Sequence, residues 1–536
     1  MKGAEAVLRT LGAGGVEVCF ANPGTTELDL VAALDTVPQV HGVLTLFEGV
    51  AAGAADGYAR VSGRPAATML HLGPGLADAL ANLHNARVAC SPVLNIVGVH
   101  ATSHQAQAPF PLDAAALARP VSGWLRRPAA RATLPSDAAD GLAAAAGPPG
   151  CVATLLIPAD LAWSAGGPPA QPRPARPLSG VPAADVQRAA RALSSGEPAA
   201  LVLGTAAARG PALIAAARAA GACGARLFLA TFPAVIDRGA GLPVVPRLGY
   251  PAAVMARQLA GVRHLVLVDT HLPVPFFAAP PPDAAAAAGR AGPPDGPAPV
   301  VPPDCTVHRL GAAGDDVTAA LGELADVLGA GPGDWQPAAA VRARRPAGPL
   351  GPDTFAAAIA AVLPDGAIIA DESLTCGFAV PEATCGAPRH QWLCGTGLAI
   401  GQGLPVATGA ALAAPGRRVI CLQADGSAMY TIQALWTQAR EGLDVTTVIC
   451  NNQSYGVLQM ELARAATSTG SGRPGPAAAS LLDLGHPALD FTGIARAMGV
   501  PATRARTADE LVSQLGRAIA EPGPSLVEAV FSGPHR

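Results

Sequence analysis

Short apolar runs alternate with alanine-rich, helix-length stretches along most of the chain. This alternation is typical of strands joined by helices in stacked α/β domains. Two stretches rich in proline and glycine, residues 166–179 and 330–352, interrupt it, because they can continue neither a helix nor a central strand. At 536 residues the chain is also too long for one hydrophobic core. We therefore predict an α/β fold with three doubly wound parallel-sheet domains, at residues 1–165, 180–330 and 351–536.

One part of the middle domain does not follow this pattern. Residues 278–304 are nearly all alanine, proline and glycine with a few aspartates. Such a composition offers little apolar surface to bury and no periodicity. It predicts a disordered or loosely packed surface insertion.

The composition excludes several classes of protein. A net charge of −3 gives no general footprint for nucleic acid and no basic patch for a membrane surface. No apolar run reaches the roughly 18 residues that span a bilayer, and the first residues lack the apolar core of a signal peptide. Lys2 is the only lysine, which excludes a Schiff-base lysine for pyridoxal phosphate and a P-loop lysine. The ten cysteines form no C-x-x-C pair, which predicts reduced thiols in a cytoplasmic protein.

The most informative segment lies in the last domain. An apolar run ends at Asp425, a helix-length amphipathic stretch follows, and a second apolar run ends at Asn452. A right-handed crossover makes such strands parallel and brings both residues to the carboxyl edge of the sheet, where α/β sheets bind ligands. With a hydroxyl or carbonyl of Ser454, they form an incomplete oxygen set for magnesium, which phosphate oxygens and water would complete. An ordinary βαβ unit with an Asp-Gly turn is the alternative.

The same segment resembles the diphosphate- and metal-binding motif of thiamine diphosphate (ThDP) enzymes, a GDG followed by NN after a helix. Ala424 stands at the first glycine. The resemblance implies ThDP and Mg²⁺ as cofactors. It implies metal ligands at Asp425, Asn452 and Ser454. The residues expected to contact the cofactor here are Asp425, Gly426, Ser427, Asn452 and Tyr455.

The first domain begins with three strand–turn–helix units. Asn22-Pro23-Gly24 forms the first turn, Glu48 starts a helix of small residues, and His71 follows a strand and precedes a Gly-Pro-Gly turn. Taken alone, Glu48 is also explained by the helix dipole, which favours acidic residues in a first turn. An isolated histidine at a strand end is also more often structural than catalytic.

These units resemble the pyrimidine-binding domain of ThDP-dependent 2-keto-acid decarboxylases and acetolactate synthases. The segments NPGTTEL, LHLGPG and ADGSAMYTIQALW place the chain closest to benzoylformate decarboxylase-like enzymes. The resemblance implies that Glu48 hydrogen-bonds the aminopyrimidine and so activates the thiazolium carbon, which needs a carboxyl able to share a proton with a weakly basic nitrogen. It also implies that Thr25 contacts the substrate carboxylate and that His71 relays protons.

Two further loops of the last domain carry the resemblance. The loop with Ser373, Leu374 and Thr375 would lie over the diphosphate, with Leu374 where benzoylformate decarboxylase has threonine. Ile400 would wedge under the cofactor and hold it bent, so that its amino group reaches its thiazolium carbon. The carbonyl of Leu398 would accept a hydrogen bond from the aminopyrimidine. Plain core packing is the alternative for Ile400.

The resemblance implies decarboxylation of a 2-oxo acid, with the resulting enamine protonated to an aldehyde or ligated to a carbonyl acceptor. Two alternatives remain: an acetolactate synthase-like transferase that joins two 2-oxo acids, and a non-catalytic homologue. We do not assign benzoylformate, because only 4% of residues are aromatic and the expected substrate stretch carries Gln459 and Glu461. FAD is not expected, because no full G-x-G-x-x-G follows Gly204.

The family also predicts the assembly. Each active site forms between the first domain of one subunit and the last domain of another, so a homodimer or homotetramer is expected. Glu48 and Asp425 of one site would then belong to different chains. Neither nucleic acid nor a membrane is expected as a partner, and the role of His271 in the middle domain stays open.

Overall fold

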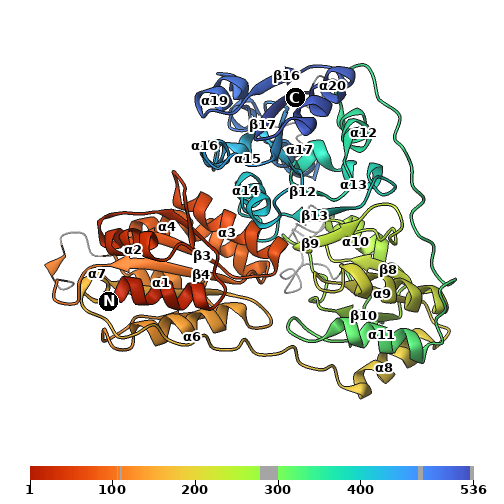
Figure 1. The fold of residues 1–536 in the computed structure, drawn as a ribbon. Coiled ribbons are helices and arrows are strands. Elements are labelled where there is room, and N and C mark those ends of the chain that lie inside the picture. The colour runs from red at the N-terminus through yellow and green to blue at the C-terminus, as the bar shows by residue number, and fades with distance from the viewer. Residues whose placement is uncertain (105–106, 109–111, 278–299, 469–474, 532–536) are drawn as a thin grey trace, which may run out of the picture.

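Three β-sheets organise the chain (Figure 1). The computed structural model describes residues 1–104, 107–108, 112–277, 300–468 and 475–531. Most of the predicted insertion at 278–304 lies outside these residues. The prediction of parallel-sheet α/β domains is confirmed: within the described residues, all strand pairs but one are parallel.

The first sheet has six strands in the order β2-β1-β3-β4-β6-β5. Helices cover both faces, because apolar side chains fill both sides of the central strands and form two separate core clusters. The strands are β1 Val18–Asn22, β2 His41–Leu44, β3 Ala66–His71, β4 Val93–Val99, β5 Trp124–Arg126 and β6 Val152–Pro158. The helices are α1 Gly3–Ala13, α2 Leu28–Ala33, α3 Glu48–Ser62, α4 Leu72–Val88, α5 Ala114–Ala118, α6 Leu134–Ala146 and α7 Ala159–Trp163, with 3₁₀ turns η1 Thr25–Glu27 and η2 Leu34–Thr36.

The middle sheet has four strands in the order β11-β10-β7-β8. They are β7 Ala199–Leu203, β8 Arg226–Leu229, β10 His264–Val268 and β11 Thr306–Arg309. Its helices are α8 Ala183–Leu193, α9 Gly210–Cys223, α10 Ala252–Leu259 and α11 Val317–Val327. One further strand from this part of the chain, β9 Val235–Arg238, leaves the middle sheet and pairs antiparallel with the third sheet.

The third sheet therefore has seven strands, in the order β16-β17-β15-β14-β12-β13-β9. Its other strands are β12 Ala367–Glu372, β13 His390–Cys394, β14 Val419–Ala424, β15 Val445–Asn451, β16 Ala502–Ala505 and β17 Ser525–Val530. Its helices are α12 Pro352–Val362, α13 Val380–Ala383, α14 Gly403–Ala413, α15 Asp425–Ala428, α16 Ala434–Arg440, α17 Gly456–Ser468, α18 Pro476–Ser480, α19 Phe491–Ala497 and α20 Ala508–Ala520, with a 3₁₀ turn η4 Leu374–Gly377.

The structure differs locally from the sequence pattern in two places. The stretch after Asp425 is not one helix: α15 ends at Ala428, and Thr431 donates its hydroxyl to Gly401 O (2.7 Å) before α16 begins. The Gly73-Pro74-Gly75 segment is not a turn but the first turn of α4, where proline is tolerated because the first N–H groups have no intrahelical partner.

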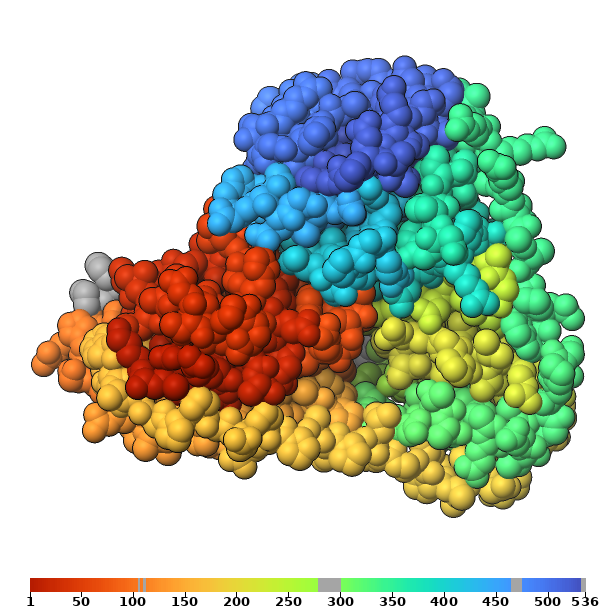
Figure 2. All heavy atoms as spheres, in the orientation of Figure 1, coloured from red at the N-terminus to blue at the C-terminus, as the bar shows by residue number. Residues whose placement is uncertain are grey.

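The third domain rests on both other domains (Figure 2). In the space-filling view its blue and cyan atoms lie against the red first domain and the yellow-green middle domain. The main contact with the first domain is between α3 and α14. Glycines allow this close approach, because a Cβ at Gly57 would lie 2.1 Å from Val406 O and one at Gly409 would lie 1.8 Å from Ala54 O. The start of α3, with Glu48, is thereby brought to the third domain.

Among the described residues, no helix is both long enough and apolar enough to cross a membrane. The cytoplasmic location, the domain boundaries and the oligomeric state stay predictions.

Candidate active site

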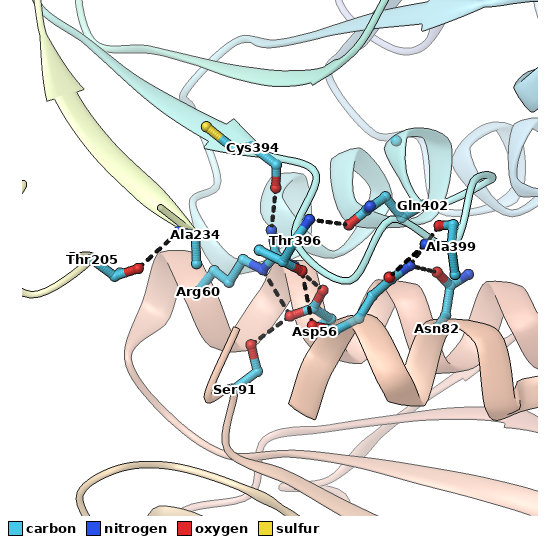
Figure 3. A network of polar contacts seen from close by, with 12 residues as sticks. Asp56, Arg60, Asn82, Ser91, Thr205, Ala234, Cys394, Thr396, Ala399 and Gln402 are labelled. Carbon is cyan, nitrogen blue, oxygen red and sulfur yellow. Dashed lines mark hydrogen bonds and ion pairs between the residues drawn. The ribbon is translucent and has the colours of Figure 1, made fainter. Parts of the chain in front are cut away.

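Two asparagines of α4 tie the first domain to the loop of residues 395–402. Figure 3 shows Asn82 and, on the loop, Ala399. Asn85 holds both backbone groups of Ala399: its Nδ2 donates to Ala399 O (2.8 Å) and its Oδ1 accepts from Ala399 N (3.3 Å). Asn82 Nδ2 donates to Gly49 O (2.8 Å) and Gly401 O (3.4 Å). The start of α3 and the loop with Leu398 and Ile400 are therefore held side by side within one chain.

A buried ion pair anchors the same loop at its start (Figure 3). Arg60 of α3 pairs with Asp56 one turn earlier, and the two side chains are 1% and 0% exposed. The Arg60 guanidinium also donates to Cys394 O (2.7 Å) and to Thr396 Oγ1 (2.9 Å). Removing either charge would leave the other buried without a partner. The pair therefore fixes α3 against the end of β13.

Glu48 is the first residue of α3 and is 8% exposed. Its carboxylate lies over Gly75 of α4, where a Cβ would come within 2.9 Å of Glu48 Oε1. In the described part of the chain, no hydrogen bond is made to this carboxylate, although Asn82, which bonds the neighbouring Gly49 O, is itself fully engaged with Asn85 and Gly401. A nearly buried carboxylate without a partner is costly, and such groups concentrate at functional sites.

His71 is bonded to a carboxylate that the sequence reasoning missed. Its Nδ1 lies 2.8 Å from Glu27 Oε2 and 3.0 Å from Thr26 Oγ1. Glu27 is fully buried, and its Oε2 also accepts from Gly24 N (2.8 Å). Gly24 is required here, because a Cβ would lie 2.3 Å from the His71 ring. Glu27 is part of the NPGTTEL segment, so the signal was present but was assigned only to Thr25.

The predicted residues Thr25 and His71 come to the same region. Thr25 begins η1 at the end of β1, and His71 ends the neighbouring strand β3. The Thr25 side chain is exposed. In the described residues it makes no side-chain hydrogen bond, whereas its neighbour Thr26 bonds both Glu27 and His71.

Asp425 and Asn452 meet at the carboxyl edge of the third sheet, as the crossover predicts. Asp425 is 2% exposed; its Oδ1 accepts from Gly426 N (2.8 Å) and its Oδ2 from Gln453 N (2.7 Å). Burial raises its pKa from 3.8 to about 6, although backbone N–H groups of residues 426 and 452–454 oppose that rise. Asn452 Oδ1 accepts from Ser454 N (3.1 Å), and the Ser454 hydroxyl donates to Leu482 O (3.3 Å).

Glycines allow side chains to pack closely at this edge. A Cβ at Gly426 would lie 2.6 Å from the ring of Tyr455, and one at Gly456 would lie 2.6 Å from Thr375 Oγ1 and 3.2 Å from Asn452 Nδ2. Thr375 of η4 therefore lies close to Asn452 and Tyr455, which belong to the segment between β15 and α17. Among the described residues, no group of three or more His, Cys, Asp or Glu side chains could hold a metal. This agrees with the make-up of the predicted oxygen set, in which Asp425 is the single carboxylate.

Glu372 is a second residue whose position the sequence did not reveal. It is 5% exposed and accepts from Gly401 N (2.8 Å), Gly403 N (2.9 Å) and Gln423 Nε2 (2.9 Å). Burial raises its pKa, and these hydrogen bonds oppose the rise. Gln423 Nε2 also donates to Ser427 Oγ (2.6 Å). Glu372 thus fixes the loop that carries Ile400 to the end of β14.

Ser373 does not present a free hydroxyl. Its Oγ donates to Asp371 Oδ1 at 2.6 Å, and its backbone N–H donates to the same oxygen at 3.1 Å. The side chain is 1% exposed. Of the diphosphate-loop residues, Thr375 is thus better placed to contact a ligand than Ser373.

Strained backbone conformations are concentrated near the predicted site residues. Four of the six non-glycine residues with positive φ in the described chain are adjacent to or among the predicted site residues: Leu72 (52°), Leu374 (51°), Leu398 (61°) and Gln453 (57°). Such conformations cost about 1–3 kcal/mol each and persist where the surroundings enforce them. Leu374 and Leu398 are also 38% and 42% exposed, so they are not held there by burial.

Some candidate residues are placed elsewhere. His271 is exposed at the end of β10 in the middle domain, and no contact with the site residues is recorded for it in the described chain. His84 of α4, in contrast, bonds the site loop through Nε2 to Gly397 O (3.0 Å).

Comparison with known proteins agrees with this geometry. The family described as "Thiamine pyrophosphate enzyme, N-terminal TPP binding domain" matches residues 1–117, and the corresponding "C-terminal TPP binding domain" matches residues 377–529. The Mycobacterium tuberculosis protein IlvX, provisionally named an acetolactate synthase large subunit, is 50% identical over 99% of each chain. Benzoylformate decarboxylase of Pseudomonas aeruginosa is 31% identical over 96% of each chain.

Solved structures share the fold. The Rhodococcus jostii RHA1 thiamine diphosphate-dependent 4-hydroxybenzoylformate decarboxylase matches with a TM-score of 0.83 over 100% of both chains, at 24% identity. Benzoylformate decarboxylase from Polynucleobacter necessarius gives 0.82 over 99% of both chains, at 21% identity. Fold and relatives together define a ThDP-dependent enzyme of the decarboxylase and acetolactate synthase type. The chain belongs to the thiamine pyrophosphate enzyme family.

The residues present fit the cofactor of this family. A buried carboxylate, Asp425, and the amide oxygen of Asn452 lie together at the carboxyl edge of the third sheet, and Gly426 and Gly456 let Tyr455 and Thr375 pack closely beside them. At the other end, Glu48 offers a carboxylate without a hydrogen-bond partner in the described chain. A hard cation prefers oxygen ligands of the kind that Asp425 and Asn452 supply.

Proposed function

We propose that the chain is a ThDP- and Mg²⁺-dependent enzyme that decarboxylates a 2-oxo acid and releases an aldehyde or transfers the remaining group to a carbonyl acceptor. The observation that carries the proposal is the placement of Glu48. It is nearly buried, makes no hydrogen bond in the described chain, and lies at a helix start that Asn82 ties to Gly401.

Residues of the last domain would hold the cofactor. Asp425 and Asn452, with Ser454, would supply oxygen ligands to Mg²⁺, and phosphate oxygens and water would be suitable further ligands. Thr375, Gly426, Ser427 and Tyr455 would line the diphosphate, together with Ser373 and Leu374. Leu398 and Ile400, on the loop that Glu372 and Asn85 fix, would contact the organic rings. When bound, ThDP would supply the electron sink for the charge left by departing carbon dioxide.

Residues of the first domain would handle protons. Glu48 would share a proton with the aminopyrimidine, for which a desolvated carboxyl is suited because no neighbouring donor competes for it. His71 would deliver or remove a proton at the substrate, with Glu27 fixing its ring through Nδ1 and leaving Nε2 for the reaction. Thr25 would contact the substrate carboxylate from its exposed position beside Gly24.

A transferase that joins two 2-oxo acids is the second candidate. The 50% identity to IlvX over nearly the whole chain supports it. Both reactions use the same residues and differ in what captures the intermediate: a proton or a second carbonyl.

One experiment tests both candidates. Purified protein with ThDP and MgCl₂ is incubated with a panel of aliphatic and aromatic 2-oxo acids, and carbon dioxide and the organic product are measured. Aldehyde as the main product supports the decarboxylase, and acetolactate from pyruvate supports the transferase. If no 2-oxo acid releases carbon dioxide and calorimetry detects no ThDP binding below about 1 mM, the chain is a non-catalytic homologue.

A further inference from the structure

A cavity rich in arginine lies between the middle and third domains, away from the candidate active site. Its volume is about 190 Å³. It is lined by Gly210 at the start of α9, Asp237 and Arg238 of β9, Leu242, Gly366, Arg389, His390 and Gln391 at the start of β13, and Arg417 just before β14. We call it the arginine cavity. It lies at the amino ends of β12, β13 and β14, whereas Asp425 and Asn452 lie at the carboxyl ends.

The charges around the arginine cavity are not balanced. Arg238, Arg389 and Arg417 line it. Burial is the main cause that lowers the pKa of Arg417; Asp237 opposes this shift, and the nearby Arg209 adds to it. Asp237 is the one carboxylate in the lining. Among the described residues, none of the four arginines forms an ion pair within 4.0 Å. The chain as a whole carries −3, so this local excess of positive charge is not a general property of its surface.

The carboxylate of Asp237 already accepts hydrogen bonds from uncharged groups. Its Oδ2 accepts from Gly210 N (2.8 Å) and its Oδ1 from Gln391 Nε2 (3.3 Å). Arg417 donates to Gly366 O (2.6 Å) and Gln391 Oε1 (2.8 Å), which orient its guanidinium without neutralising it. The Arg389 guanidinium makes one hydrogen bond in the described chain, from Nε to Ala240 O (3.3 Å). Donors on Arg389 therefore remain for a ligand.

Two lining residues also have buried polar atoms without a partner in the described chain, Arg238 Nε and His390 Nε2. His390 is 3% exposed, and its Nδ1 bonds Pro388 O (2.8 Å). Burial lowers the pKa of His390 to about 4, so the ring is neutral. Burial, followed by the charge of Arg247, lowers the pKa of Arg238 to about 10. Because Nδ1 of the neutral His390 donates to Pro388 O, its Nε2 is an acceptor and fits a P–OH group or a water, whereas Arg238 Nε is a donor for an anionic oxygen. Native proteins rarely leave such groups unpaired without a ligand or water.

We propose that the arginine cavity binds a small oxyanion of the phosphate type, supplied as free phosphate or as the phosphate group of a nucleotide. Guanidinium groups bind phosphate with strong, charge-assisted hydrogen bonds. The volume favours a small group, because whole drug-sized ligands occupy about 300–1,000 Å³ and a water about 30 Å³. The occupant bridges β9, which comes from the middle segment, and β13, so it strengthens the junction of the two domains.

The test uses the full chain saturated with ThDP and Mg²⁺, so that the diphosphate site is filled. Inorganic phosphate and ADP are titrated by calorimetry and by thermal unfolding at constant ionic strength, with chloride as the comparison anion. Phosphate raises the unfolding temperature, because a ligand that binds only the folded state stabilises it. Arg389→Ala weakens the binding about tenfold or more, as expected for a lost hydrogen bond between charged groups. Arg389 is exposed, so this change leaves the fold intact.

The matched control is Arg342→Ala, which removes an exposed arginine from the linker and leaves binding unchanged. Arg209→Gln provides a second variant that removes a charge beside Arg417. If ADP binds more tightly than phosphate and with the same sensitivity to Arg389→Ala, the source is a nucleotide. Equal responses of R389A, R209Q and R342A, or no binding of either anion up to about 10 mM, overturn the proposal.

Discussion

The carboxylates of the candidate active site have different surroundings in the first and the third domain. At the edge of the third sheet, Asp425 and Glu372 accept hydrogen bonds from backbone N–H groups and from Gln423. At the edge of the first sheet, Glu48 makes no hydrogen bond in the described chain. The first arrangement fixes a carboxylate as a ligand or anchor, and the second leaves it able to exchange a proton. Under the proposed function, cofactor binding and proton transfer would therefore fall to different domains.

The largest effect is expected when Glu48 can no longer exchange a proton. Glu48→Gln keeps the shape of the side chain but cannot accept a proton. We expect kcat to fall by about 10²–10⁴-fold, the usual contribution of acid–base catalysis, with ThDP still bound. Exchange of the thiazolium proton in D₂O, followed by NMR, reports this step directly. Glu323→Gln, an exposed change on α11, serves as the control. A wild-type exchange rate in E48Q would remove Glu48 from its assigned role.

The matching change at the other edge is Asp425→Asn. The amide retains one oxygen but loses the charge that a hard cation requires. Because losing a supporting residue around a metal ligand already costs about 10–100-fold in affinity, the loss of a ligand charge should cost about 100-fold or more. Calorimetric titration with Mg²⁺ in the presence of ThDP measures it. Asp353→Asn, exposed near the start of α12, should leave the affinity unchanged; an equal affinity in both variants would exclude Asp425 as a ligand.

The raised pKa of Asp425 gives a smaller effect that depends on pH. The cation binds the carboxylate form, so Mg²⁺ affinity should rise about tenfold per pH unit up to about 6 and level off above it. Without metal the sign of the stability effect is opposite. Because the folded-state pKa lies above 3.8, the contribution of this group is complete below pH 3.8 and is lost as pH rises through about 6. Both profiles should flatten in D425N, and unchanged profiles there would assign the titration to another group.

The smallest effect concerns the contact between the two edges. Asn85→Ala removes both hydrogen bonds to Ala399, and we expect about tenfold weaker ThDP binding with a loss of about 1–3 kcal/mol in stability. Asn95→Ala is the matched control: Asn95 is equally buried and bonds Thr68 and Thr154, but it contacts no part of the site loop. N95A should lose similar stability and keep its ThDP affinity. If both variants bind ThDP equally well, Asn85 does not position the loop.

Local patterns predicted the parts of the site that depend on strand order. Asp425 and Asn452 had to meet, because a right-handed crossover leaves few other arrangements. Short sequence patterns also predicted correctly that a helix begins at Glu48 and that a strand ends at His71.

Other parts depend on contacts between distant segments, which no local pattern encodes. Asn85 and Ala399 are 314 positions apart, and Glu27 and His71 are 44 apart. The positive φ of Leu374 and Leu398 could not be predicted either, since leucine gives no preference for that conformation. The break between α15 and α16 has the same cause, because the hydroxyl of Thr431 bonds a carbonyl 30 positions away.

The pairing of β9 with β13 has a consequence for the independence of the last domain. Residues 351–536 alone would lack β9, and the backbone groups of residues 390–393 that face residues 235–238 would be exposed along one side of β13. An uncovered strand of this kind is a template for pairing with other chains, so the fragment should self-associate where the whole protein does not. The middle segment of the chain, which joins the first domain to the last, thus also covers one edge of the sheet that carries Asp425.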